Sequence, residues 1–304
     1  MSNWGKGVIN NIGWGQGANN DIGWGSIYDK SNAGETLLTD LNINAFIIEV
    51  NTANTGVSNA DQFQFTGAEG DYDVVAKQND IVVANFNDLS NQETITLPSS
   101  GVYVLEISAK EVNGFNSIQF AGNGDKLKLS KIIQWGIFNT TRTSLFLGCL
   151  NLTEIADDNN WLNSLENGTA NFSGYSLTFL PSTLTLESLE SALLMFRDNL
   201  LTDLPDGMNL NNLRNGQGIF NGNLLTDLPD GMNLNNLENG QGMFLNCKIN
   251  TPRYSKLLID MEASNNNNDV PFNGGSSQYN AEGEIARNLL IANHNWTITD
   301  GGLV

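Results

Sequence analysis

Residues 199–213 read Asn-Leu-Leu-Thr-Asp-Leu-Pro-Asp-Gly-Met-Asn-Leu-Asn-Asn-Leu, and residues 223–237 repeat the same letters. The longer segments 198–221 and 222–245 agree at 20 of 24 positions. A repeat of this length is one structural unit that cannot bury its own apolar side chains. We therefore expect each unit of about 24 residues, called a coil here, to stack on the next one.

The same skeleton extends from the two near-identical coils toward the N-terminus. Leu180-Pro181 stands 24 residues before Leu204-Pro205. One Phe in each unit marks about five coils: Phe146, Phe172, Phe196, Phe220 and Phe244. A period of 20–29 residues with Leu at fixed places is typical of leucine-rich repeats. The pattern predicts a leucine-rich-repeat solenoid over residues 127–250.

Short apolar runs separated by turn signals fill residues 36–126. Ala45–Val50 and Val102–Ile107 are two of these runs, and Pro98-Ser99-Ser100-Gly101 is a turn signal before the second. Strand-like runs at roughly ten-residue spacing are typical of antiparallel sandwiches. We expect a β-sandwich-like domain here.

Residues 251–304 follow the last coil and predict a cap with two helices. In the second helical pattern, over residues 281–293, we expect Ile285, Leu289 and Leu290 to point inward. A terminal cap covers apolar surface that the last coil would otherwise expose. The predicted fold class is thus mainly β with some α.

The first 35 residues carry a second repeat, with a period of ten. Trp4, Trp14 and Trp24 are each followed by Gly. Such dense glycine loses much backbone entropy on ordering, so this segment is not expected to fold alone. Three regularly spaced Trp side chains can bury a large area against a partner. We interpret residues 1–35 as an extended anchor that docks by these Trp residues.

Charge and composition exclude several functions. The chain of 304 residues has 14 Lys and Arg against 33 Asp and Glu, a net charge of −19. Such a chain is not expected to hold nucleic acid or an anionic membrane. With one His and two Cys, a His-based triad or a His/Cys metal site is not expected. We predict no enzyme activity, no cofactor and no metal.

The two cysteines, Cys149 and Cys247, each lie three residues after a marker Phe. They therefore occupy one place on coils four apart. Neighbouring strands are about 4.8 Å apart, which separates the two residues by about 19 Å. A disulfide needs Cα atoms within about 7 Å. We expect two free, buried thiols.

Amide side chains recur at matching places on the two near-identical coils. Asn215 and Gln217 match Asn239 and Gln241. Their side chains offer both donors and acceptors, which suits sugar hydroxyls or a protein edge. We take these four residues as the candidate ligand face. The alternative interpretation is that they only satisfy the backbone of turns.

Residues 146–153, Phe-Leu-Gly-Cys-Leu-Asn-Leu-Thr, resemble a hallmark of BspA-like leucine-rich-repeat proteins. Residues 127–136, 271–279, 286–290 and 296–302 are similar to the start of such arrays and to the element that often closes them. These proteins occur as bacterial surface adhesins and as virion proteins of bacteriophages. The Trp-Gly decapeptides resemble N-termini of phage structural proteins. The resemblance implies recognition, without catalytic residues.

Three hypotheses follow. In the first, the chain is a bacteriophage virion protein, a head or tail fibre or spike. It docks on other virion proteins by its N-terminus and presents its repeats to a host glycan or protein receptor. By analogy with phage fibres it would be a homo-oligomer, a trimer, on the virion surface. In the second, it is a bacterial cell-surface adhesin, which needs a secretion signal and an anchor. In the third, it is an enzyme such as a glycan depolymerase, which needs a carboxylate pair in a cleft.

Overall fold

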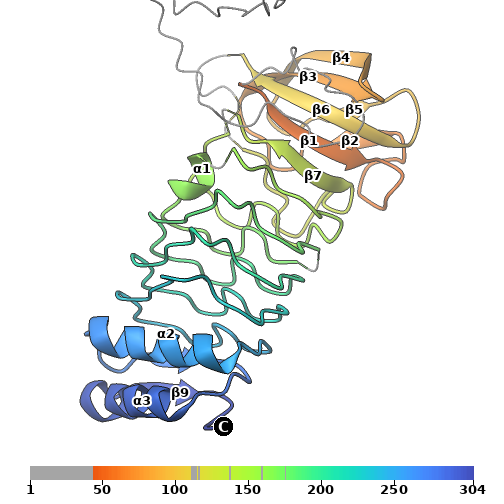
Figure 1. The fold of residues 1–304 in the computed structure, drawn as a ribbon. Coiled ribbons are helices and arrows are strands. Elements are labelled where there is room, and N and C mark those ends of the chain that lie inside the picture. Colours follow the sequence, from red (N-terminus) through yellow and green to blue (C-terminus); the bar gives the residue numbers. More distant parts are fainter. Residues whose placement is uncertain (1–43, 111–114, 116, 137, 159, 175) are drawn as a thin grey trace, which may run out of the picture. The chain divides into compact units, whose positions relative to one another are not determined.

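The computed structural model describes residues 44–110, 115, 117–136, 138–158, 160–174 and 176–304. Trp4, Trp14 and Trp24 of the predicted anchor lie outside these residues. The described chain is mainly β with few helices, and its largest sheet has five strands (Figure 1).

The five-stranded sheet is antiparallel throughout. Its strands lie in the order β4 (Ile81–Ser90), β3 (Asp71–Gln78), β6 (Val102–Ala109), β1 (Phe46–Asn51) and β7 (Leu129–Gln134). A separate pair joins β2 (Gln62–Gln64) to β5 (Thr94–Thr96). The last sheet strand, β7, comes from the segment predicted to hold the repeats.

Alternation along the strands builds the core of the sheet. Val74 of β3 pairs with Ile107 of β6, which pairs with Phe46 of β1, and all three are buried. Strand β2 belongs to the covering layer, where Phe65 contacts the Tyr72 ring edge-on, with centroids 5.3 Å apart. Side chains of period two thus bury one face of the sheet under the pair β2–β5.

Strand β7 belongs both to the sheet and to the stack of coils. On one side it pairs with β1, for example through Glu49 and Lys131. On the other side the Ile132 N–H donates to the Glu154 carbonyl, 3.0 Å away. The sheet and the first coil are therefore joined through one strand.

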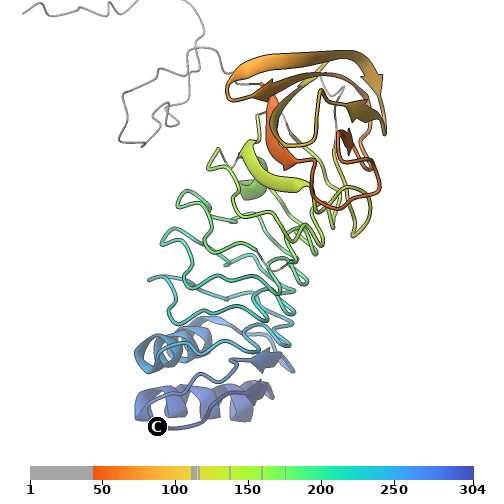
Figure 2. The ribbon, with the colours of Figure 1, turned by 90° about the vertical axis from the view of Figure 1, so that its right-hand side faces the viewer.

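The coils that follow stack through parallel backbone ladders (Figure 2). Parallel bridges join Asn167 to Ser191, Ser191 to Asn215, and Asn215 to Asn239. The Gly216 N–H, for example, donates to the Asn239 carbonyl at 2.8 Å. Among the described residues of these coils, regular helix is limited to the short α1 (Asn160–Asn163). Backbone N–H and carbonyl groups of each coil thus find hydrogen-bond partners on the neighbouring coil.

The marker phenylalanines form a continuous ring stack inside the coils. Successive centroids are 5.5, 5.7, 6.1 and 5.8 Å apart, and the interplanar angles lie between 4° and 16°. The predicted stacking is confirmed for all five rings: Phe146, Phe172, Phe196, Phe220 and Phe244. All five side chains are buried, so this row is the central core of the stack.

The last two layers are α2 (Thr251–Ser264) with β8 (Pro271–Asn273), and α3 (Ala281–His294) with β9 (Thr297–Thr299). Strand β8 continues the coil ladder, because the Gly240 N–H donates to the Pro271 carbonyl at 2.8 Å. Strand β9 pairs in parallel with β8. Both helices start at an Asn cap: the Asn250 and Asn280 side chains accept from the backbone.

The predicted inward face of α3 was wrong at two of three positions. Leu290 is buried as expected, but Ile285 is 63% exposed and Leu289 is 37% exposed. The face that packs against α2 carries small residues instead, Gly283 and Ala286. A Cβ on Gly283 would lie 3.0 Å from Ser255 of α2. Close approach of the two helices therefore selects small side chains, and the larger ones face away.

Candidate functional site

The four residues of the candidate ligand face lie together on two adjacent coils. The Asn215 side-chain oxygen accepts from the Gln217 N–H at 3.2 Å, and Asn239 accepts from the Gln241 N–H at 3.1 Å. The Asn239 amide also donates to the Gln217 side chain at 3.2 Å. The face is preorganised, and both Asn side chains take part in holding their turns.

A charged row runs beside this face. Its members are 24 residues apart and all exposed: Glu166, Glu190, Arg214 and Glu238. Arg214 pairs with Glu238 at 2.6 Å. The row therefore keeps a net negative charge, and an approaching anion would meet repulsion that salt screens.

Exposed leucines form an apolar stripe that we did not predict. Leu200 and Leu224 occupy the same place on adjacent coils, and Leu224 is 56% exposed. The next residue of each pair, Leu201 or Leu225, is fully buried. The repeated Asn-Leu-Leu triplet carried this signal, because adjacent residues of an extended segment point to opposite sides.

Two buried polar side chains, Asn199 and Asn223, each stand three residues after a marker Phe. The Asn223 amide donates to the Phe196 and Phe220 carbonyls at 2.8 and 3.1 Å. Its oxygen accepts from the Leu201 N–H at 3.1 Å. Asn199 makes the equivalent bonds one coil earlier. These side chains satisfy backbone groups that the turn leaves unpaired.

Cysteine takes the same place on the last coil. The Cys247 thiol lies 3.4 Å from the Phe220 carbonyl, to which it donates. Burial raises the pKa of Cys247 to about 11, and burial also raises the pKa of Cys149. The prediction of two free, buried thiols is confirmed. Neither thiol has the lowered pKa of a nucleophile.

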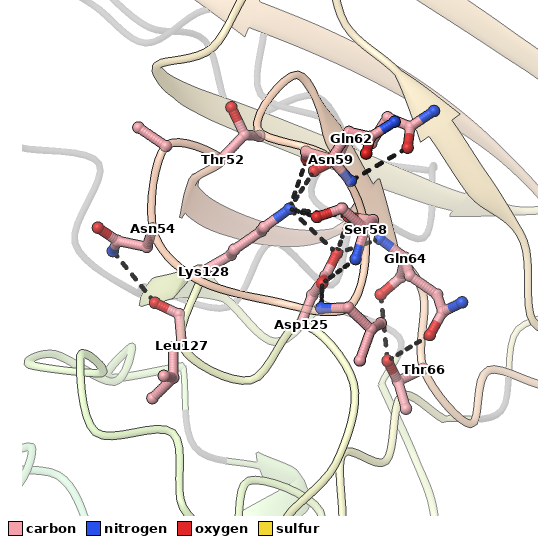
Figure 3. A network of polar contacts seen from close by, with 12 residues as sticks. Thr52, Asn54, Ser58, Asn59, Gln62, Gln64, Thr66, Asp125, Leu127 and Lys128 are labelled. Carbon is pink, nitrogen blue, oxygen red and sulfur yellow. Dashed lines mark hydrogen bonds and ion pairs between the residues drawn. The ribbon is translucent and has the colours of Figure 1, made fainter.

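Figure 3 shows a buried ion pair where the sheet meets the first coil. Lys128 and Asp125 are both fully buried, and the ammonium lies 3.6 Å from the carboxylate. The Lys128 ammonium donates to the carbonyls of Ser58, Asn59 and Gln62 at 2.8–3.1 Å. Sequence reasoning missed this pair, because nothing local indicates that residues 58–62 fold over it.

The carboxylate of this pair is equally well satisfied. Asp125 accepts from the backbone N–H groups of Val57, Ser58 and Gln64 at 2.8, 3.1 and 2.8 Å, and from the Ser58 hydroxyl. Gly56 passes so close that a Cβ there would meet the carboxylate. A buried pair with every group bonded is a structural feature that fixes residues 56–64 on the turn 125–128.

Within the described residues, no group of three or more His, Cys, Asp or Glu side chains is placed to hold a metal ion. Over the same residues, no helix combines the length and apolar character needed to cross a bilayer. Comparisons of the chain with protein-family models, curated proteins and solved structures found no match.

Proposed function

We propose that the coils are a leucine-rich-repeat solenoid of the BspA-like type and that the chain is a bacteriophage virion protein, a head or tail fibre or spike. The observation that carries this proposal is the coil stack, with its row of Phe rings and its buried Asn residues. Stacked repeats present a continuous, repetitive surface, which suits extended ligands. In this proposal residues 1–35 dock on other virion proteins.

The proposed ligand is a neutral host-surface glycan or a protein receptor. The candidate ligand face offers amide groups held in fixed geometry, for example Gln217 and Asn239. Glu166 and Glu190 stand beside it, and Arg214 is paired with Glu238. An acidic glycan would therefore meet like charge, whereas a neutral ligand has no such penalty.

Incorporation into particles tests the virion assignment. Mass spectrometry of purified virions should detect the chain. A variant with Trp4, Trp14 and Trp24 changed to Ala should no longer be incorporated, because it loses the apolar area that we assign to docking. The matched control changes the three Trp to Phe and should be incorporated better. Virions without the chain, together with its detection on bacterial cells, would favour the adhesin alternative.

Adsorption tests the ligand face. Purified full-length chain in excess should slow phage adsorption to host cells. The double variant Gln217→Ala, Gln241→Ala should compete less well. The control, Asn85→Ala with Asn87→Ala, changes two exposed amides on β4 and should compete like the unchanged chain. If a large excess of unchanged chain leaves adsorption unaffected, a decorating role on the particle replaces receptor binding.

A further inference from the structure

Six Asn-Gly pairs lie within the described residues, and one of them differs from the others. Their asparagines are Asn123, Asn167, Asn215, Asn221, Asn239 and Asn273. In such a pair the glycine nitrogen can attack the asparagine side chain, because glycine has no Cβ to hinder the approach. The attacking N–H must be free of a hydrogen bond. The bonding of the glycine N–H therefore separates protected pairs from a reactive one.

Five of these pairs are held by hydrogen bonds between layers of the stack. The N–H of Gly216 donates to the Asn239 carbonyl at 2.8 Å, and the N–H of Gly222 donates to the Leu245 carbonyl at 2.9 Å. The same kind of bond to the next layer, at 2.8 Å, holds the N–H groups of Gly168, Gly240 and Gly274. Ladder bonds inside a packed stack open rarely, so attack by these nitrogens is suppressed.

The pair Asn123-Gly124 lies at the start of the stack, where no coil precedes it among the described residues. Phe120 has the place of a marker Phe there, because its N–H donates to the next coil at 2.8 Å. Gly124 then matches Leu224, four residues after a marker Phe, whose N–H donates to the preceding coil at 2.9 Å. Within the described residues the Gly124 N–H has no such acceptor, and Asn123 is exposed.

We propose that Asn123 is a site of spontaneous deamidation in the folded chain. The Gly124 nitrogen loses its proton and bonds to the side-chain carbonyl carbon of Asn123, and the amide nitrogen leaves as ammonia. Water then opens the resulting cyclic imide at either of its carbonyls. The product is an aspartate at position 123 or an isoaspartate, whose backbone runs through the side-chain carbon. Water is the only co-reactant, and the neutral amide becomes a carboxylate.

The site lies two residues before Asp125 of the buried ion pair. An isoaspartate adds a backbone carbon between positions 123 and 124. Gly124 packs too closely to absorb the added length, because a Cβ there would collide with the Thr66 hydroxyl. The added length therefore displaces Asp125, whose carboxylate holds residues 56–64. Deamidation thus weakens the junction of the sheet and the coils as the molecule ages.

Peptide mapping of the full-length chain during incubation at neutral pH tests the proposal. Mass spectrometry should show conversion at Asn123 about tenfold or more faster than at the pairs held by ladder bonds. In urea the ladder bonds are lost, so all of these pairs should convert at similar rates. A folded chain that converts Asn123 no faster than Asn215, or urea that leaves the difference in place, would overturn the proposal. A further pair, Asn113-Gly114, lies outside the described residues and is measured separately.

Two variants separate the reaction from its consequence. Asn123→Gln should abolish conversion at this position, because the longer side chain closes a larger ring slowly. Asn221→Gln is the matched control and should leave conversion at Asn123 unchanged. Asn123→Asp carries the new charge without the added backbone carbon, so aged chain enriched in isoaspartate should unfold at a lower urea concentration than this variant. Equal urea midpoints would contradict the displacement of Asp125.

Discussion

At the scale of single residues, one coil position supplies side-chain hydrogen bonds to buried backbone groups. It is occupied by Asn199, Asn223 and Cys247 on successive coils. The two Asn side chains each hold three backbone groups of two coils. Cysteine donates one weaker bond there. On these three coils the position therefore holds a side chain that donates a hydrogen bond to a buried carbonyl.

Asn223→Ala should destabilise the chain by about 3 kcal/mol or more, because the Leu201 N–H and two buried carbonyls lose their partner. Asn223→Cys should cost less, since Cys247 is accommodated at the equivalent place. Urea unfolding measures both changes. The control is Asn221→Ala, a partly exposed amide two residues away, which should change stability by less than about 0.5 kcal/mol. Equal losses at residues 221 and 223 would contradict the assigned role.

Cys247 makes stability fall at alkaline pH. Burial raises its pKa from 9.0 to about 11 in the folded chain. Above pH 9 the unfolded chain loses the thiol proton while the folded chain keeps it, so stability decreases up to about pH 11. The effect is at most about 3 kcal/mol. Cys247→Asn cannot ionise and matches Asn223 in type, so its unfolding free energy should fall less over this range. Parallel pH curves for the two proteins would disprove the assignment.

At the scale of elements, the ring stack holds the coils in register. Phe220→Ala should cost about 3–5 kcal/mol, because it opens a cavity between the Phe196 and Phe244 rings. Phe196→Ala should behave alike. Leu224→Ala, at an exposed place on the same coil, is the matched control and should cost far less. Thermal or urea unfolding measures these losses of stability. A loss under about 1 kcal/mol at Phe220 would refute the stacking register of the coils.

The ring stack, the buried thiols and the runs that become strands were predictable from sequence, because period and alternation fix which side chains are inside. The exposure of Ile285 and Leu289 was not predictable, because an apolar side chain on a helix does not by itself indicate which helix face is buried. Gly283 and Ala286 decide that face through close packing on α2. Likewise, Asp125 and Lys128 are residue types expected in a surface turn. They are buried because residues 56–64, which are distant in sequence, fold over them.

At the scale of the whole molecule, the buried pair fixes residues 56–64 on the turn 125–128, directly before β7. Lys128→Met should cost about 3–5 kcal/mol, because Asp125 stays buried without its counter-ion. The control is Lys131→Met, whose partner Glu154 is solvent-exposed at 3.4 Å, and it should cost under about 1 kcal/mol. Denaturant titration followed by tryptophan fluorescence and by far-ultraviolet circular dichroism measures both. Similar losses in both variants would mean that the buried pair is dispensable.

The near-identity of residues 198–221 and 222–245 also bears on heredity. A third copy inserted between them would meet on each side the ladder, the ring and the amide that it already fits. In-frame recombination between the parts of the gene that encode these two coils would therefore add or delete one whole coil and leave both ends of the stack unchanged. Sequencing this gene across a natural population should reveal alleles that differ by entire coils. The length of the coil stack would then be an inherited property that changes in steps of one coil.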